Sequence, residues 1–154
     1  MKNKINISII GMGYVGLPLA CKFGNFYNTV GFDISNDRIK QLKRNKDITN
    51  EVDYKEINRS NKLFFTSSEI KLKDSNVYII TVPTPISSKK KPDLRPLKAA
   101  SKTVAKYLEF GDTVIFESTV YPGATEEICV PLLEKYSGLT YNKDFYCGYS
   151  PERI

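Results

Sequence analysis

The sequence predicts an α/β fold: a parallel, doubly wound sheet of about six strands with helices on both faces, in a single domain over residues 1–154. Short β-rich runs alternate with longer segments of helical apolar spacing along the whole chain. A glycine-rich turn follows the first run and opens a helical segment. A length of 154 residues suits one domain with one core, and no repeat or low-complexity tract divides it.

The N-terminal segment predicts one strand followed by one helix. Residues 5–10 are rich in isoleucine, which favours a strand. Over 14–26 apolar residues recur at helical spacing, and Pro18 is tolerated because it falls close to the first turn. The recurring residues are Val15, Leu19, Phe23 and Phe26. Lys2 and Lys4 before the apolar run also resemble the start of a secretory signal, but the glycines that interrupt the run favour a strand and a turn.

Strand and helix patterns continue to alternate through the first half of the chain. A strand over 29–34 leads to Ser35, which suits the N-cap of a helix over 36–44. Ile39 and Leu42 lie on the buried face expected for that helix. The remaining elements of this half are a weakly helical stretch over 51–60 and strands over 62–66 and 77–82.

Prolines punctuate the second half of the chain. Pro83 and Pro85 force an extended loop after the fourth strand, because neither residue can continue a helix. Pro96 suits the first residue of a helix that ends near Leu108, and Pro122 opens another helix. The apolar face of this last helix is Ile128, Leu132 and Leu133. The remaining strands are expected over 113–117 and 145–149.

The scarce residue types exclude several classes of function. The chain has no histidine, which excludes a Ser-His triad and most zinc hydrolase sites within it. Cys21, Cys129 and Cys147 form no CxxC pair and are odd in number, so we expect reduced thiols in a cytoplasmic protein and no metal site.

Charge and hydropathy point to neither a membrane nor a nucleic acid as partner. No apolar run approaches the roughly 20 residues of a membrane-spanning helix. The formal net charge of +6 allows an anionic partner, but the lysines are scattered and the single run at 89–91 is typical of a surface loop. Basic residues interleaved with stacking aromatics, as in nucleic-acid binders, are not seen.

The glycine-rich turn is the strongest local signal for a ligand. Gly11 permits a tight turn, Gly13 lets the backbone approach a pyrophosphate, and Gly16 lets the helix pack against the sheet. Tyr14 and Val15 complete the turn, and the helix N-terminus that follows offers N–H groups to phosphates. The pattern predicts a Rossmann-type dinucleotide-binding fold.

An acidic residue at the expected distance strengthens this prediction. Asp33 lies 22 residues after Gly11, at the end of the second strand, where a carboxylate accepts hydrogen bonds from ribose hydroxyls and repels a 2′-phosphate. The sequence therefore favours NAD over NADP. Arg38, which is also expected to bind the cofactor, leaves an alternative open, because a nearby guanidinium can bind a 2′-phosphate. Asp33 as a simple turn cap is the other alternative.

Polar residues also follow three later strands at the same predicted edge of the sheet. Ligands of open parallel sheets lie outside the carboxyl ends of the strands. The polar residues at these ends are Thr84, Ser118, Thr119 and Glu152.

Four linked motifs resemble the N-terminal NAD-binding domain of the UDP-glucose/GDP-mannose dehydrogenase family. They are GMGYVGLP at 11–18, VPTP at 82–85, ESTVYPG at 117–123 and SPERI at 150–154. The resemblance covers essentially the whole chain and implies oxidation of the C6 hydroxymethyl of a nucleotide sugar to a carboxylate, with two NAD molecules used in turn. The residues SPERI and YPGATE resemble the branch that oxidises UDP-N-acetylhexosamines for capsule and O-antigen biosynthesis.

The resemblance also implies roles for individual residues. Thr84 and Thr119 would line the nicotinamide side, with Ser118 beside them, and Thr119 would help to hold a catalytic water. Glu152 would orient or deprotonate that water during thioester hydrolysis. Arg153 and Ile154 would contact the UDP-sugar substrate.

The nucleophilic cysteine of the family belongs to segments that would follow this domain. Cys147 lies within a strand pattern and is expected to be a packed thiol. The chain is therefore expected to be a fragment of a longer enzyme, inactive alone, whose parent is a homodimer or a higher oligomer.

Two alternatives remain from the sequence. A stand-alone NAD-sensing regulatory module would explain the glycine turn and Asp33 without any chemistry. Another dehydrogenase of the β-hydroxyacid type would share the glycine turn, but it would not explain the motifs around Thr119 and Glu152.

Overall fold

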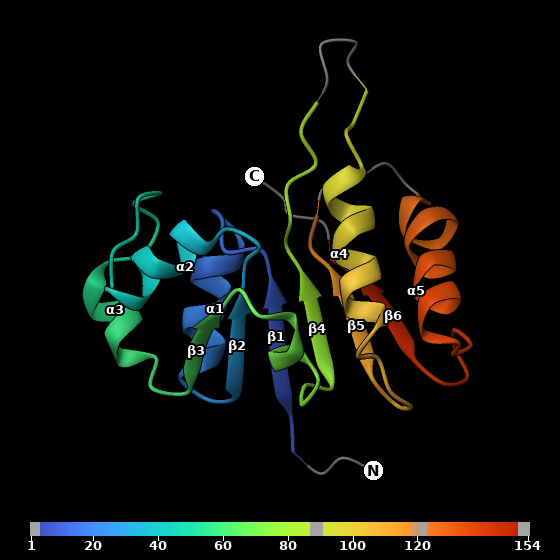
Figure 1. The fold of residues 1–154 in the computed structure, drawn as a ribbon, viewed down its shortest axis with the longest axis horizontal. Coiled ribbons are helices and arrows are strands. Elements are labelled where there is room, and N and C mark those ends of the chain that lie inside the picture. Colours follow the sequence, from blue (N-terminus) through green and yellow to red (C-terminus); the bar gives the residue numbers. More distant parts are fainter. Residues whose placement is uncertain (1–3, 87–90, 119, 121–122, 151–154) are drawn as a thin grey trace.

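A six-stranded, all-parallel sheet forms the centre of the protein (Figure 1). The computed structural model describes residues 4–86, 91–118, 120 and 123–150. The strand order is β3-β2-β1-β4-β5-β6, so the chain moves outward from β1 in one direction and then returns to build the other half. This is the order of a doubly wound Rossmann sheet, and the predicted fold class is confirmed.

The helices and strands largely follow the sequence pattern. Their bounds are β1 (Asn6–Ile10), α1 (Gly16–Gly24), β2 (Asn28–Phe32), α2 (Asn36–Lys43), α3 (Tyr54–Arg59), β3 (Leu63–Thr66), η1 (Glu69–Leu72), β4 (Val77–Ile80), α4 (Arg95–Ala105), β5 (Thr113–Phe116), η2 (Thr125–Cys129), α5 (Val130–Ser137) and β6 (Tyr146–Tyr149). Ser35 caps α2 as predicted, because its Oγ accepts a hydrogen bond from the Arg38 backbone N–H at 3.2 Å.

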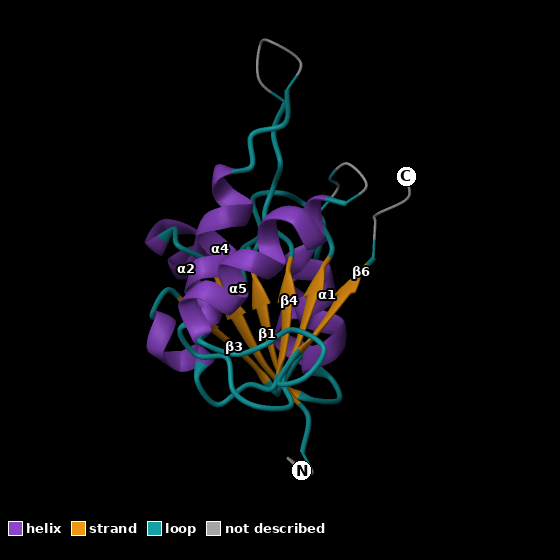
Figure 2. Ribbon diagram, turned by 90° about the vertical axis from the view of Figure 1, so that its right-hand side faces the viewer, coloured by secondary structure: helices purple, strands orange, loops and turns teal. Residues whose placement is uncertain are grey.

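Helices cover both faces of the sheet, and each face has its own apolar cluster (Figure 2). On one face, α1 and α2 pack against the sheet through residues such as Leu17 and Leu42. On the other face, α4 and α5 pack through Leu97 and Leu133. β1 lies between β2 and β4 and contributes Ile9 to the first cluster and Ile10 to the second. This alternation is what a strand buried on both faces requires.

The first helix buries other residues more deeply than those of the predicted apolar spacing, of which Leu19 and Phe23 are partly buried against the core. Its fully buried side chains are Leu17, Ala20 and Cys21, whereas Phe26 is 72% exposed. Because α1 ends at Gly24, Phe26 lies in the turn before β2 and no longer follows the helical spacing. Small residues face the sheet because the helix packs close to it. β1 is a central sheet strand, so the apolar run is not the core of a signal helix.

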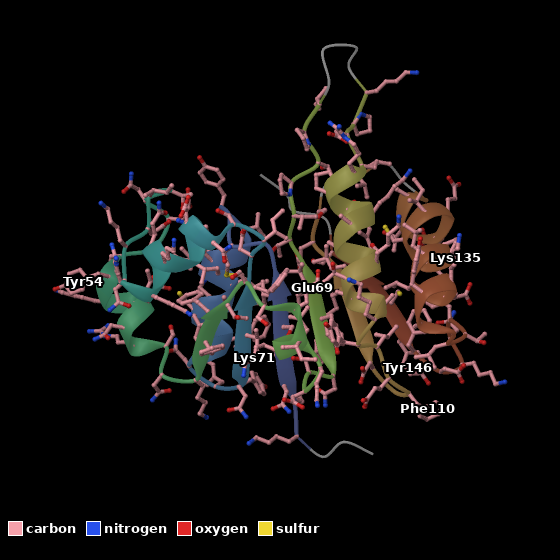
Figure 3. The ribbon with its side chains drawn as sticks, viewed as in Figure 1. Tyr54, Glu69, Lys71, Phe110, Lys135 and Tyr146 are labelled. Atoms are coloured by element: carbon pink, nitrogen blue, oxygen red, sulfur yellow. The ribbon has the colours of Figure 1, made fainter. Side chains whose placement is uncertain are left out.

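The 3₁₀ helix η1 and the π-helical form of η2 were not expected from the sequence. η1 is a 3₁₀ helix whose Glu69 carboxylate accepts hydrogen bonds from Lys106 Nζ at 2.8 Å and from Thr103 Oγ1 at 3.3 Å, which joins it to α4 (Figure 3). η2 is a π-helical turn in which Val130 N–H donates to the Thr125 carbonyl. Pro131 follows and has no N–H to give to the preceding turn, which accounts for the widened bonding pattern. Pro122, expected to open this helix, lies outside the described residues.

The three cysteine thiols are buried or partly buried. Burial raises the pKa of Cys21 to about 11 and that of Cys147 to about 12, and it also raises the pKa of Cys129. Such thiols stay protonated and are poor nucleophiles. Among the described residues, no helix has the length and apolar character needed to cross a membrane.

Candidate nucleotide-binding site

Each glycine of the turn after β1 is required for a different physical reason. Gly11 has φ +102°, and its N–H donates to the Phe32 carbonyl at 2.8 Å. A Cβ on Gly16 would collide with the Gly11 carbonyl oxygen and with the Thr81 hydroxyl. A Cβ on Gly13 would meet nothing within 4 Å. Gly11 and Gly16 are therefore needed for the fold, whereas the open space over Gly13 is available to a ligand.

The N-terminus of α1 follows the turn and is suited to an anion. Its N-cap residue is Val15, whose side chain makes no capping hydrogen bond to the first turn. The first turn carries no acidic residue. The helix dipole places partial positive charge at this end, and unpaired N–H groups of a first turn bind phosphates. Tyr14 projects outward and is largely exposed, and Val15 is half-buried.

Asp33 joins the glycine turn to the turn that follows β2. Its Oδ2 accepts a hydrogen bond from the Met12 N–H at 2.8 Å, and its Oδ1 accepts one from the Ser35 N–H at 2.8 Å. The second bond is the turn cap that the sequence left open as an alternative. The carboxylate also lines the hollow at this edge, so capping the turn and facing a ligand are compatible.

The Arg38 side chain is held beside the glycine turn by polar contacts at two of its nitrogen atoms. Its Nε donates to the Met12 carbonyl at 2.8 Å, and its Nη2 lies 2.8 Å from Asp47 Oδ1. The side chain is only 9% exposed, and its Nη1 is buried without a hydrogen-bond partner among the described residues. The guanidinium borders the hollow, but its charge is already balanced by Asp47. It is therefore less available to a 2′-phosphate than a free arginine would be.

A hollow of about 490 Å³ opens at the carboxyl edge of the sheet, between the ends of β1, β2 and β4. Asp33 and the glycine turn form its polar part. Its walls are mostly apolar and include Ile34 and Ile48, which are 85% and 58% exposed. Large apolar side chains left open to solvent beside a hollow favour contact with a flat heterocycle such as adenine. The apolar and small residues that complete the wall are Pro83, Pro96, Ala99 and Ala100.

The sequence pattern did not predict that Ile34 and Ile48 line this hollow. Ile34 directly follows the acidic residue at the end of β2, and Ile48 is an isolated apolar residue in a polar loop. The sequence signal that could have identified such residues is an apolar residue that no strand or helix buries.

The residues expected on the nicotinamide side are only partly visible. Ser118 follows β5, and its Oγ donates to the Val82 carbonyl at 2.7 Å, which ties the ends of β5 and β4 together. Thr84 is half-buried in the extended segment after β4. The four other residues predicted for catalysis or substrate contact lie outside the described residues. They are Thr119, Glu152, Arg153 and Ile154.

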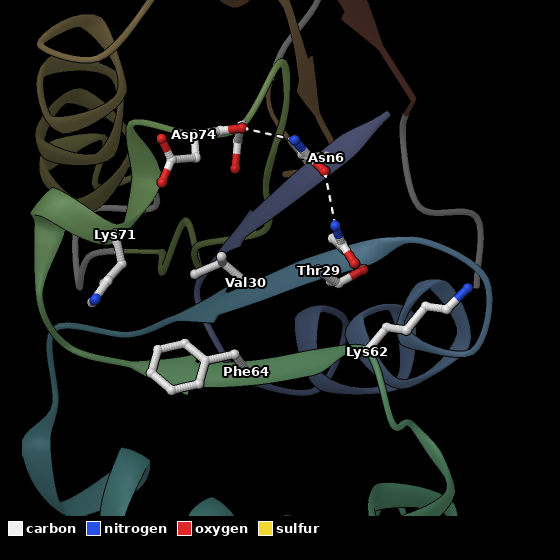
Figure 4. A pocket seen from close by; sticks show the side chains of 9 residues that line it. Asn6, Thr29, Val30, Lys62, Phe64, Lys71 and Asp74 are labelled. Carbon is white, nitrogen blue, oxygen red and sulfur yellow. Dashed lines mark hydrogen bonds between the residues drawn. The ribbon is translucent and has the colours of Figure 1, made fainter. Parts of the chain in front are cut away.

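A second hollow, of about 440 Å³, lies at the opposite, amino edge of the sheet (Figure 4). Asn6 Nδ2 donates to the Asp74 carbonyl at 3.0 Å, and Asn28 Nδ2 donates to Asn6 Oδ1 at 3.2 Å. Lys62 and Lys71 also line it. It contains neither a glycine turn nor the N-terminus of a helix.

Comparison with known proteins identifies the family. Residues 5–154 match the family described as UDP-glucose/GDP-mannose dehydrogenase family, NAD binding domain. The chain belongs to this family. The resemblance seen in the sequence and the NAD cofactor are thereby confirmed.

Several of the similar proteins are named as nucleotide-sugar dehydrogenases. The UDP-N-acetyl-D-glucosamine 6-dehydrogenase of Pseudomonas aeruginosa is 55% identical over 150 residues, which are 97% of this chain and 36% of that protein. Protein CapL of Staphylococcus aureus is 56% identical over 149 residues, which are 97% of this chain and 35% of that protein. This chain therefore spans just over a third of the length of these relatives.

Solved structures agree. The UDP-D-ManNAc dehydrogenase of Pyrococcus horikoshii superposes with a TM-score of 0.88 at 41% identity, covering 97% of this chain and 37% of that one. A ternary complex of GDP-mannose dehydrogenase from Pseudomonas aeruginosa superposes with a TM-score of 0.89 at 27% identity, covering 97% of this chain and 36% of that one.

The described residues of this NAD-binding domain fit the dinucleotide. The space left by the missing Cβ of Gly13 lies at the uncapped end of α1, where a pyrophosphate needs N–H donors. The apolar walls and Asp33 then offer a base-binding slot beside a ribose acceptor.

Proposed function

We propose that this chain is the cofactor-binding part of a nucleotide-sugar 6-dehydrogenase. The parent enzyme would oxidise the C6 hydroxymethyl of a UDP-sugar, in this case a UDP-N-acetylhexosamine, to a carboxylate for capsule or O-antigen biosynthesis. The proposal rests on the hollow at the carboxyl edge, which is lined by the glycine turn and Asp33. It rests equally on 55% identity to a UDP-N-acetyl-D-glucosamine 6-dehydrogenase. The relative named CapL supports the link to capsules.

The proposed roles of the residues follow their positions. Backbone N–H groups at Gly13, Tyr14 and Val15 bind the pyrophosphate, while Gly11 and Gly16 shape the turn. Asp33 accepts hydrogen bonds from the adenosine ribose, with Arg38 bordering it. When bound, the oxidised nicotinamide supplies the acceptor for the hydride that leaves C6.

The catalytic edge of the chain is proposed from the motifs. Thr84, Ser118 and Thr119 would face the nicotinamide, and Thr119 and Glu152 would hold a water. Glu152 would take the proton of that water as it attacks a thioester formed on a cysteine of the parent enzyme. Arg153 and Ile154 would contact the UDP-sugar.

The proposal extends to the parent enzyme. Residues 1–154 would be its NAD-binding domain, and a second domain would supply the nucleophilic cysteine. The parent would act as a homodimer or a higher oligomer in the cytoplasm, and the three free thiols of this chain support that compartment.

Cofactor titration of the 154-residue chain tests the proposal. We expect NADH to bind at least about tenfold more tightly than NADPH, because the Asp33 carboxylate repels a 2′-phosphate. We also expect no oxidation of a UDP-sugar. A preference for NADPH, or turnover of a UDP-sugar by this chain alone, would contradict it.

A further inference from the structure

The loop between α2 and α3 is built around the carboxylate of Asp47. Its Oδ1 accepts hydrogen bonds from the Thr49 N–H at 3.0 Å and from the Thr49 hydroxyl at 2.7 Å. Its Oδ2 accepts from the N–H groups of Glu51 at 2.9 Å and Val52 at 3.2 Å. The Asp47 side chain is only 1% exposed. One buried carboxylate therefore holds three backbone N–H groups within the five residues that follow it.

Arg38 connects this loop to the glycine turn. Its Nη2 lies 2.8 Å from Asp47 Oδ1, and its Nε donates to the Met12 carbonyl at 2.8 Å. The Met12 N–H in turn donates to Asp33 Oδ2 at 2.8 Å. A continuous chain of polar contacts thus runs from Asp33, through the turn and Arg38, to Asp47.

Asp47 does not itself line the hollow, but the two residues after it do. Ile48 forms part of the apolar wall, and Thr49 lies beside it. We propose that Asp47 is a positioning residue for the adenosine half of NAD: it holds Ile48 and Thr49 against the glycine turn, so that the base-binding wall is formed before the ligand arrives. This inference rests on the proposed placement of adenosine in the carboxyl-edge hollow.

The chemistry of the ion pair supports a positioning role. A buried ion pair is a weak source of stability, because desolvation cancels much of the attraction between the charges. Burial opposes ionisation of Asp47, but the hydrogen bonds from Thr49, Arg38 and Val52 outweigh it and lower the pKa of Asp47 to about 2. The carboxylate is thus charged at any physiological pH. An apolar pair would fill the space equally well but could not direct the loop backbone.

Asp47→Asn tests the proposal, with Asp53→Asn as the matched control. An asparagine at 47 keeps the shape but turns an NH₂ group toward backbone N–H donors. Asp53 lies in the same segment and caps α3 through a bond to the Glu56 N–H, without contact to Arg38 or the hollow. Far-UV circular dichroism and a thermal melt establish that each variant is folded at the titration temperature.

Two overlapping fragments of the dinucleotide are then titrated separately. ADP-ribose, which contains the adenosine and lacks only the nicotinamide base, is titrated by calorimetry, and nicotinamide mononucleotide, which lacks the adenosine, by NMR. We expect D47N to weaken ADP-ribose binding about tenfold while changing nicotinamide mononucleotide binding less than about twofold, and D53N to change both less than about twofold. A general loss of structure would weaken both fragments together. Equal losses for the two fragments, or unchanged ADP-ribose binding by folded D47N, would overturn the proposal.

Amide hydrogen exchange in the wild-type chain gives an answer even if D47N does not fold. We expect the N–H groups of Thr49, Glu51 and Val52 to be protected in the free protein and to change little when ADP-ribose is added. Unprotected amides that become protected only with ligand would overturn preorganisation by Asp47. If the wild-type chain bound no ADP-ribose at all, the proposed function would fail instead.

Discussion

The two edges of one sheet carry hollows of similar volume, about 490 Å³ at the carboxyl edge and about 440 Å³ at the amino edge. At the carboxyl edge, β1 and β4 lead away to opposite halves of the sheet, and their loops separate. That crevice receives the glycine turn, the α1 N-terminus and Asp33. At the amino edge, Asn6 donates to the Asp74 carbonyl and accepts from Asn28, and these residues line the second hollow together with Lys62 and Lys71 (Figure 4). Topology and backbone donors, rather than the volume of a hollow, therefore distinguish the nucleotide site.

The largest loss of stability is expected from a substitution at Gly16, where the start of α1 passes close to the Gly11 carbonyl at the carboxyl edge. Gly16→Ala places a Cβ against the Gly11 carbonyl and the Thr81 hydroxyl, and it should destabilise the fold by about 3 kcal/mol, or roughly 10 °C in Tm. Gly148→Ala in β6 is the control, because its Cβ would come no closer than 3.7 Å to Ile115. Thermal melts of both variants are compared with that of the wild type, and equal Tm values for G16A and G148A would refute the packing argument.

Gly13 should separate binding from stability. Gly13→Val places a Cβ where no atom beyond the adjacent residues lies within 4 Å, so the Tm should change by less than about 3 °C. The same side chain would stand where a pyrophosphate approaches, and NADH affinity should fall by more than tenfold, on the order of 2 kcal/mol. Calorimetry measures the affinity. Retention of NADH binding by folded G13V would move the ligand away from this turn.

Asp33 should affect affinity and stability together. Asp33→Asn leaves one carbonyl oxygen to serve the N–H groups of Met12 and Ser35, so unfolding free energy should fall by about 1 kcal/mol. The loss of the carboxylate should also weaken NADH about tenfold and narrow the preference for NADH over NADPH. Urea unfolding and parallel titrations with both cofactors provide the two values. An unchanged ratio of the NADH and NADPH affinities would show that Asp33 does not contact the ribose.

The carboxyl edge should also carry a pH signature from Asp47. The pKa of this carboxyl is lowered from 3.8 to about 2 in the folded protein, so ionised Asp47 contributes stability above pH 4 that is lost as pH falls through about 2. Urea unfolding of the wild type and of D47N at pH 6 and pH 2.5 measures this contribution. The difference between the two proteins should shrink at the lower pH, and a constant difference would contradict the assignment.

The smallest effect is expected at the amino edge. Lys71→Ala removes a cation from the second hollow and should change NADH affinity by less than about twofold, because that hollow offers no backbone donors from a glycine turn. A fall in affinity comparable with that of Asp33→Asn would reverse the comparison between the edges.

Much of the nucleotide site could be predicted from sequence because its parts are local. The spacing of Gly11, Gly13 and Gly16 after a β-rich run and the acidic residue at the next strand end are short-range features. Asp47 was missed because its function depends on a long-range contact with Arg38, which no periodic pattern reveals. The roles proposed for Thr119 and Glu152 stay predictions from motifs.

The helices illustrate the same limit. Apolar spacing located α1, Pro96 marked the start of α4, and Ser35 identified the start of α2. The spacing did not reveal that α1 buries small residues against the sheet, which depends on the close backbone approach at Gly16. It also did not reveal that α1 ends at Gly24, which leaves Phe26 exposed in the turn. Nor did it reveal that the helix around Ile128 begins with a π-helical turn, η2, which reflects the missing N–H of Pro131.

One measurement tests the central claim most directly: an NMR titration of the ¹⁵N-labelled chain with NADH, following every backbone amide. The largest shifts are expected at the glycine turn and its neighbours, at Gly11, Gly13 and Asp33, with little change at the amino edge around Asn6 and Lys71. Shifts concentrated at the amino edge, or none at saturating NADH, would contradict the account.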